Sequence, residues 1–210
     1  MEKVKDGLIE WGVASQAFDG QQKSGDMCLV KLLAREALVA VVDGLGHGDG
    51  AAAVAEIAIA TLEACAGQSL VALVNHCHQA LRQTRGAVMS LASLRPLDST
   101  MSWLGVGNVE GSLWRANVQE FPGPASLVLQ GGLVGDHLPR LRASRVAITK
   151  GDLLIFATDG VQPHFPDPMV LTYPPQQVAE GILARNSRGT DDALVLVARC
   201  VYGKDQASAR

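Results

Sequence analysis

Short apolar runs separated by polar turns dominate the first forty residues of the chain. Leu8–Ala17 alternates apolar and polar positions irregularly, whereas Met27–Leu33 and Ala37–Val42 are more strongly apolar. The polar pair Arg35-Glu36 between the last two runs predicts a β-hairpin. Because Ala37–Val42 is almost wholly apolar, we expect it to be a central strand buried on both faces.

The hydrophobic period changes after a glycine-rich stretch at residues 44–50. Residues 51–66 are rich in Ala, Leu, Ile and Glu and contain no Pro or Gly, which predicts a helix. Gly67 ends this segment, and Ser69 is a suitable N-cap for a second helix from Leu70 to about Arg85. The sequence therefore predicts two helices in succession with no strand between them.

The second half of the chain returns to short strands with turn residues between them. A further helix is predicted from Pro174 to Asn186, where prolines open the segment. This pattern favours an α+β protein with mostly antiparallel sheets and helices on their faces. The predicted strands are 100–106, 111–116, 126–129, 143–148, 153–157 and 193–201.

Composition narrows the class of protein. The chain has 210 residues, of which 48% are hydrophobic, so we expect one globular domain over residues 1–203 and a polar tail at 204–210. A net charge of −3 argues against a nucleic-acid-binding surface. No apolar run reaches the ~18 residues that span a bilayer, and no signal peptide is evident. The four cysteines are widely spaced and contain no CxxC pair, which indicates reduced thiols and a cytoplasmic location.

Acidic residues stand at the ends of three strongly apolar runs. Asp43 and Asp159 each follow such a run and precede a glycine, and the pair Asp191-Asp192 precedes another. A single Asp-Gly is more often a turn, but several carboxylates that leave buried strands repel one another unless a cation joins them. Oxygen ligands of this kind suit Mg²⁺ or Mn²⁺.

Four motifs in order make the chain resemble the metal-dependent (type 2C) protein serine/threonine phosphatases, in particular their bacterial SpoIIE-like branch. Within the family, it most resembles the small stressosome-feedback members, which carry no extra sensor domain. The resemblance covers residues from about 10 to 200. The motifs are Ser24-Gly25-Asp26, residues 41–48 (VVDGLGHG), residues 151–161 (GDLLIFATDGV) and residues 189–195 (GTDDALV).

The resemblance implies a four-layer αββα sandwich in which helix pairs flank two mostly antiparallel sheets. It also implies two Mn²⁺ or Mg²⁺ ions, activation of water by these ions and no phospho-enzyme. The catalytic residues would be Asp43, Asp159 and Asp191, acting through metal-activated water. The metal ligands would be these three with the Gly44 carbonyl, Asp192 as a weaker candidate than its neighbour Asp191, and Asp26, directly or through water.

The substrate implied by the resemblance is a phosphorylated regulatory protein, either a stressosome protein or an anti-anti-sigma factor. We expect a monomer that binds neither nucleic acid nor membrane. A catalytically weak relative that serves as a binding module is the alternative, although such a module has no need for poorly hydrated carboxylates.

The chain departs from the larger members of the family at three positions. Leu45 replaces the histidine that those enzymes carry two residues after the first metal-binding Asp, and we expect that His47 does not take over its role as general acid. No arginine stands shortly before Ser24-Gly25-Asp26, where the family's phosphate-binding arginine lies. Asp98 does not match the register of the third-metal aspartate.

Two other patterns suggest different sites. Residues 46–51 fit the G-x-G-x-x-A pattern of dinucleotide sites, but a second helix follows where that fold needs a parallel strand. His76 and His78 are two residues apart on a predicted helix, so they point to different faces and do not bind one metal together.

Overall fold

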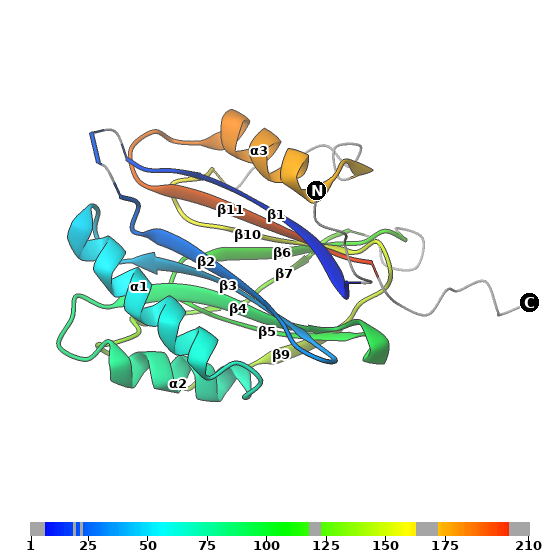
Figure 1. The fold of residues 1–210 in the computed structure, drawn as a ribbon, viewed down its shortest axis with the longest axis horizontal. Helices are drawn as coiled ribbons and strands as arrows, with labels where there is room; N and C mark the ends of the chain where they lie inside the picture. Colours follow the sequence, from blue (N-terminus) through cyan, green and yellow to red (C-terminus); the bar gives the residue numbers. More distant parts are fainter. Residues whose placement is uncertain (1–6, 19, 22, 118–122, 163–171, 202–210) are drawn as a thin grey trace, which may run out of the picture.

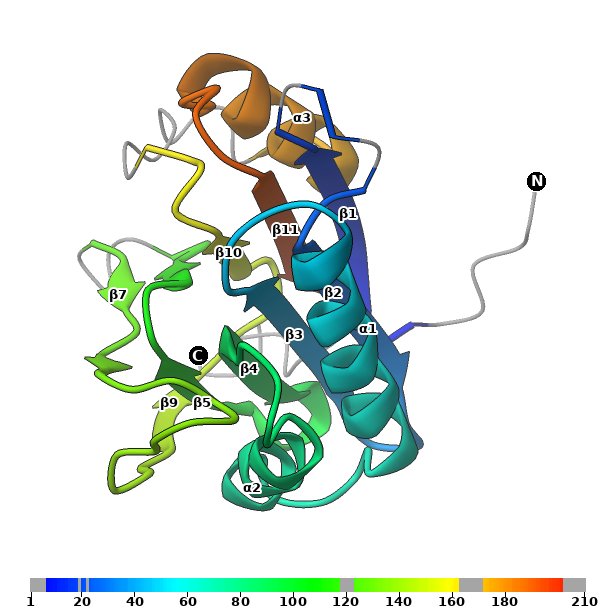
Figure 2. The same ribbon diagram turned by 90° about the vertical axis from the view of Figure 1, so that its left-hand side faces the viewer.

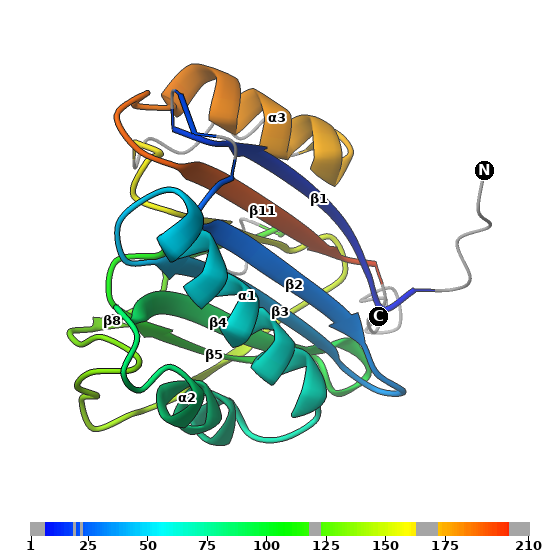
Figure 3. The ribbon, with the colours of Figure 1, turned by 60° about the vertical axis from the view of Figure 1, so that its left-hand side comes forward.

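The computed structural model describes residues 7–18, 20–21, 23–117, 123–162 and 172–201. Two sheets lie face to face, with α1 and α2 outside one sheet and α3 outside the other (Figures 1 and 3). The predicted α+β, αββα arrangement is therefore confirmed. The outer layer next to the first sheet contains α3 without a second helix among the described residues; part of the β10–α3 connection, 163–171, lies outside them.

The first sheet pairs the two ends of the chain. Its order is β1 (Ile9–Gln16), β11 (Ala193–Cys200), β10 (Leu153–Ala157), β6 (Glu110–Trp114) and β7 (Ala125–Ser126). All four pairings in this sheet are antiparallel. Helix α3 (Pro175–Asn186) packs on its outer face, where the backbone of Gln176 lies directly against Gly12.

The second sheet contains the predicted hairpin. Its order is β2 (Asp26–Leu32), β3 (Ala37–Gly44), β4 (Ala87–Arg95), β5 (Thr100–Val106) and β8 (Leu129–Gln130), and β9 (Ser144–Ala147) also pairs with β5. The short 3₁₀ helix η1 (Pro96–Asp98) joins β4 to β5. Helices α1 (Asp49–Ala64) and α2 (Leu70–Ala80) cover its outer face, as Figure 2 shows.

The apolar run of β3 has a simple structural cause. Leu38, Ala40 and Val42 pack under the helices, whereas Val39 and Val41 pack between the two sheets. Alternate side chains of a strand point to opposite faces, so a strand between two cores must be apolar at every position. The sequence prediction of a central buried strand is confirmed.

The segment after β3 excludes the dinucleotide-binding alternative. Helix α1 is followed by α2, and both neighbours of β3, β2 and β4, run antiparallel to it. A dinucleotide-binding βαβ unit needs a parallel neighbouring strand.

The structure also bears on the remaining predictions about whole segments. No helix in the described part of the chain is long and apolar enough to cross a membrane. The four cysteines, all of them among the described residues, form no disulfide, as expected. The single-domain boundary at residue 203 stays a prediction, and the predicted tail at 204–210 lies outside the described residues.

Candidate metal-dependent active site

Strand ends from both sheets meet at one end of the sandwich and bring the predicted aspartates together. Asp26, at the start of β2, pairs in register with Asp43, near the end of β3. Asp159 follows β10, and Asp191 precedes β11. A cleft of about 200 Å³ lies between Asp43, Asp159 and Asp191. It is lined by Asp43, Leu45, Gly46, Val88, Gly107, Asn108, Asp159 and Asp191.

Burial and repulsion from neighbouring carboxylates make Asp26, Asp43 and Asp159 hard to ionise. The pKa of Asp43 is raised to about 8, first by burial and then by the charge of Asp26. The pKa of Asp26 is raised to about 7, mainly by burial, although a hydrogen bond from Thr158 lowers it. Burial also raises the pKa of Asp159, followed by repulsion from Asp191. Each shift has the direction expected for carboxylates that gather without a cation.

This donor set fits divalent cations that prefer oxygen ligands. The three aspartates in the cleft wall supply carboxylate oxygens, which suit Mg²⁺ or Mn²⁺. Among the residues that the structure describes, however, no three acidic, histidine or cysteine side chains are already close enough to hold one ion. Like charges favour such an open arrangement, so cation binding would draw the carboxylates together.

Asp26 is fixed by a contact between the two sheets. Its side chain is only 5% exposed and accepts a 2.7 Å hydrogen bond from the Thr158 hydroxyl. The same hydroxyl accepts a 2.8 Å bond from the Leu194 amide. Thr158 therefore holds the start of β2 against β10 and β11. Asp26 does not line the cleft directly, which agrees with an indirect role at the metal site.

Asp192 has different surroundings from its neighbour Asp191. It is 3% exposed, and its two carboxylate oxygens accept 2.7 Å hydrogen bonds from the amides of Phe18 and Gly25. These bonds hold the segment before β2 against the start of β11. Because both oxygens already have donors, this geometry favours a positioning role over direct coordination; metal binding by Asp192 remains a prediction.

The glycines after Asp43 and Asp159 are required by backbone packing. A Cβ on Gly44 would lie 2.3 Å from the carbonyl oxygen of Ala51 in α1. A Cβ on Gly160 would lie 2.0 Å from the carbonyl oxygen of Asp192. The neighbouring backbone therefore accounts for both glycines without any close approach to an ion. Coordination by the Gly44 carbonyl stays a prediction.

Asn108 belongs to the site and was not predicted from the sequence. Its side-chain amide donates a 2.7 Å hydrogen bond to Asp159 Oδ2. Its only signal in the sequence is the pair Gly107-Asn108, which is typical of a turn. In the structure this turn places an amide donor in the cleft, where it orients one oxygen of Asp159.

His47, His76, His78 and Asp98 lie outside the cleft wall. His47 is exposed, with its ring centroid 5.7 Å from that of Phe18. His76 contacts Gln68, whereas His78 accepts a bond from the Gly135 amide, so the two histidines have separate partners as expected. Asp98 forms ion pairs with Arg35 and Arg95, each at 3.4 Å.

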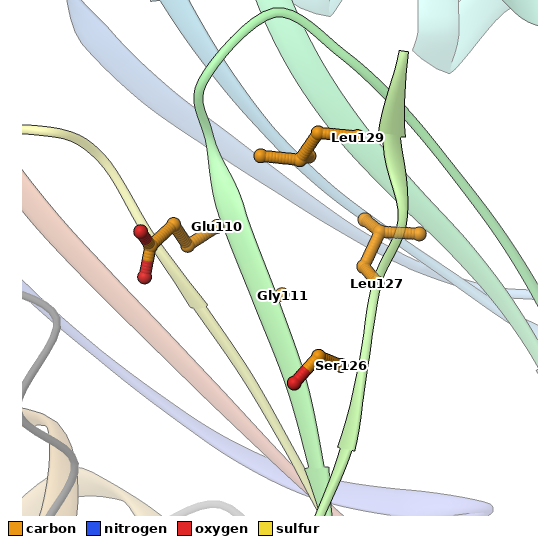
Figure 4. A pocket seen from close by; sticks show the side chains of 5 residues that line it. All are labelled: Glu110, Gly111, Ser126, Leu127 and Leu129. Carbon is orange, nitrogen blue, oxygen red and sulfur yellow. The ribbon is translucent and has the colours of Figure 1, made fainter.

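A second hollow lies beside β6, the strand that begins two residues after Asn108. It has a volume of about 210 Å³ and is lined by Glu110, Gly111, Ser126, Leu127 and Leu129. In Figure 4, the Glu110 carboxylate and the side chains of Leu127 and Leu129 lie on opposite sides of β6. The hollow therefore has an acidic and an apolar side.

Comparisons with known proteins agree with this geometry. The family described as Stage II sporulation protein E (SpoIIE) matches residues 34–201. The phosphoserine phosphatase RsbX of Bacillus subtilis (strain 168) is 27% identical over 148 residues, which cover 68% of this chain and 70% of RsbX.

Solved structures share the fold. A chain described as "The bacterial stressosome: a modular system that has been adapted to control secondary messenger signaling" is 32% identical, with a TM-score of 0.85, and the match covers 91% of this chain and 99% of that one. RsbX in complex with magnesium has a TM-score of 0.78 at 20% identity, and the match covers 93% of this chain and 96% of RsbX. At that identity, the likeness to the magnesium complex concerns the fold.

The family match spans most of the chain, and the fold and the cluster of aspartates are those expected from the motifs. The resemblance inferred from the sequence, including the likeness to small stressosome-feedback phosphatases, is confirmed. The chain belongs to the SpoIIE family and is a protein serine/threonine phosphatase of the PP2C type.

Proposed function

We propose that the chain uses divalent metal ions to hydrolyse phosphoserine or phosphothreonine on a regulatory partner protein. The observation that carries this proposal is the cleft in which Asp43, Asp159 and Asp191 converge from three strand ends. Carboxylates of one sign that gather in one cleft repel one another and are costly unless they bind cations. A catalytic site that binds metal ions gives a reason for this unfavourable cluster of carboxylates, whereas a simple binding module gives none.

Asp43, Asp159 and Asp191 are the residues that would hold the ions, and we expect two. Gly44, Asp26 and Asp192 would support them. Divalent ions in such a site lower the pKa of water and neutralise charge on the phosphoryl oxygens. Asn108 orients Asp159, and Thr158 fixes Asp26, so hydrogen bonds already hold two of the carboxylates before the ions would draw the set together.

The lining of the cleft favours direct attack by water. Its described residues include no cysteine, serine, threonine or histidine that would act as a nucleophile or a general acid. Leu45 is half-exposed at the position where larger relatives carry a histidine. We therefore infer hydrolysis without a phospho-enzyme, with the leaving serine or threonine oxygen protonated by water at a modest cost in rate.

The proposed partner is a phosphorylated stressosome protein in the cytoplasm. Two relatives support this choice: RsbX is a phosphoserine phosphatase, and the 32% identical chain is described as part of work on the stressosome. A phosphorylated anti-anti-sigma factor is the competing substrate, and monomeric action is proposed in either case.

The test is phosphate release from each phosphorylated protein, with Mg²⁺ or Mn²⁺ and with EDTA. We expect metal-dependent release that is faster from the stressosome protein, and an intact protein mass that shows no phosphoryl adduct. Faster release from the anti-anti-sigma factor would reassign the partner. Failure to hydrolyse either protein or a generic phosphomonoester would contradict the enzymatic proposal and favour the binding module.

A further inference from the structure

The cleft has acidic walls, but its substrate is also anionic. A phosphoserine carries a charge of about −1.5 to −2 near neutral pH. The described residues of the cleft wall include no lysine or arginine. The first arginine of the chain is Arg35, and it pairs with Asp98 in η1, so it does not supply the phosphate-binding arginine missing before Asp26.

Arg85 lies against the loop that forms one wall of the cleft. Its Nη1 donates a 3.3 Å hydrogen bond to the carbonyl of Leu45, a residue of that wall. The backbone holds the two segments together, because the Leu45 amide donates a 3.0 Å bond to the Gly86 carbonyl. The guanidinium is therefore next to the cleft and is placed there by ordered structure.

Two glycines leave room for this guanidinium. A Cβ on Gly46 would lie 3.0 Å from Nη1, and a Cβ on Gly50 would lie 2.5 Å from Nη2. Gly46 is itself part of the cleft wall. A side chain at either position would displace Arg85, so the absence of side chains permits the guanidinium to lie against the loop.

Stability alone does not explain this placement. Arg85 is exposed, and it forms no ion pair with any described carboxylate. Its guanidinium lies at the first turn of α1, where the helix dipole disfavours a cation. Its one described side-chain hydrogen bond is long and goes to a neutral carbonyl, which contributes little.

Arg188, which lies near Asp159, provides a contrast. Its amide donates a 2.8 Å bond to the Gly160 carbonyl, and its charge lowers the pKa of Asp159. Arg188 therefore already has an electrostatic partner in the apo cleft, whereas Arg85 has none among the described carboxylates.

We infer that Arg85 binds the phosphate of the phosphorylated substrate and replaces the arginine that the chain lacks before Asp26. Its remaining donors suit phosphoryl oxygens, because a planar guanidinium matches phosphate in bidentate geometry. The inference rests on the proposed function and adds a substrate-binding residue to it. The group recognised is the phosphate itself, independent of the protein that carries it.

The test compares Arg85→Gln and Arg85→Lys with the matched control Arg82→Gln, a nearby exposed arginine beyond the end of α2. KM and kcat are measured with Mg²⁺ and a phosphoserine peptide. Binding is measured separately by fluorescence anisotropy, with a labelled peptide in which a non-hydrolysable phosphonate replaces the phosphate. Melting temperatures in EDTA report any structural effect.

We expect Arg85→Gln to raise both KM and the Kd of the phosphonate peptide by at least about tenfold, or 1.4 kcal/mol. We expect kcat to change less than about threefold. Arg85→Lys should keep part of the affinity, because lysine retains the positive charge but lacks the planar set of donors that binds phosphate in bidentate geometry. Arg82→Gln should behave as wild type, and the melting temperature of Arg85→Gln should stay the same.

Two results would overturn the inference: a Kd within twofold of wild type for Arg85→Gln, or a weaker Kd that accompanies an equal loss in Arg82→Gln or a lower melting temperature. Failure of the proposed function gives a different pattern. In that case the wild-type protein would not hydrolyse the phosphoserine peptide, whereas the anisotropy measurement would still report whether Arg85 binds the phosphonate.

Discussion

Asp191 lines the cleft, whereas Asp192 is buried behind it and accepts two backbone hydrogen bonds. The two neighbours are thus suited to different roles, one toward the ions and one toward the segment before β2. The motif in the sequence favoured Asp191 over Asp192 as a ligand, and this order agrees with the contacts of the two side chains.

This difference predicts that substitution of Asp192 mainly lowers stability, whereas substitution of Asp191 mainly weakens metal binding. Asp192→Ala removes the acceptors of the buried Gly25 amide and the half-buried Phe18 amide, so it should lower the free energy of unfolding in EDTA by about 2–4 kcal/mol. Asp191→Ala should change it by less than about 1 kcal/mol, but should weaken binding of Mn²⁺ at least tenfold. Urea denaturation and calorimetry measure the two quantities. Equal losses of stability in both variants would contradict the assignment.

Asn108 and Thr158 show what residue-level patterns could not reveal. The aspartates were predicted because several carboxylates at the ends of apolar strands repel one another unless a cation joins them. Asn108 belongs to the common turn pair Gly107-Asn108, and Thr158 is one residue of the motif at 151–161. Their roles depend on contacts with Asp159 and Asp26, at sequence separations of 51 and 132 residues. Such separations leave no local pattern.

Most helices and strands were predicted close to their observed bounds, and the exceptions have physical causes. Strand β4 was missed because residues 87–95 mix Ala, Met, Leu and Ser, which have no strong β propensity. Its central position between β3 and β5 overrides that local preference. The predicted helix 70–85 ends earlier, at Ala80.

The predicted strand 126–129 is divided between the two sheets. β7 pairs with β6 in one sheet, and β8 pairs with β5 in the other. Leu127, between them, is buried in the core that separates the sheets. An apolar run alone does not say which sheet each of its residues joins, so this crossing could not be predicted from the sequence.

Helix α3 depends on a glycine in β1, which gives a prediction at the level of elements. A Cβ on Gly12 would lie 2.3 Å from Cα of Gln176, so Gly12→Ala should force α3 away from the sheet. We expect a loss of about 1–3 kcal/mol in the free energy of unfolding. Gly131→Ala is the matched control, because a Cβ on Gly131 would have no other atom within 4 Å. Similar stability of both variants would show that α3 does not need this close contact.

The whole molecule should respond to pH through its cluster of carboxylates. The pKa values of Asp26 and Asp43 are raised from 3.8 to about 7 and about 8 in the folded protein. Between these values the folded state binds more protons than the unfolded state, so stability must fall as pH rises. Stability from these groups is fully present below pH 3.8 and is lost as pH rises through about 7 to 8.

We therefore expect the melting temperature of the metal-free protein to fall as pH rises from about 6 to about 8.5. Asp43→Asn should flatten this slope, because it removes one titrating group and the repulsion that it exerts on Asp26. Saturating Mg²⁺ should oppose the fall, because metal ligands are held in their ionised form. A wild-type slope that Asp43→Asn leaves unchanged would show that other groups cause it.

The function proposed for the molecule requires that the convergent aspartates bind the ions that activate water for phosphate hydrolysis. Calorimetric titration of wild type and Asp43→Asn with Mn²⁺, paired with phosphate release from a phosphoserine substrate by the same samples, measures this requirement. We expect two ions per wild-type chain, loss of tight binding in Asp43→Asn and loss of turnover with it. Unchanged stoichiometry, affinity and turnover in Asp43→Asn would refute the shared metal site and the mechanism built on it.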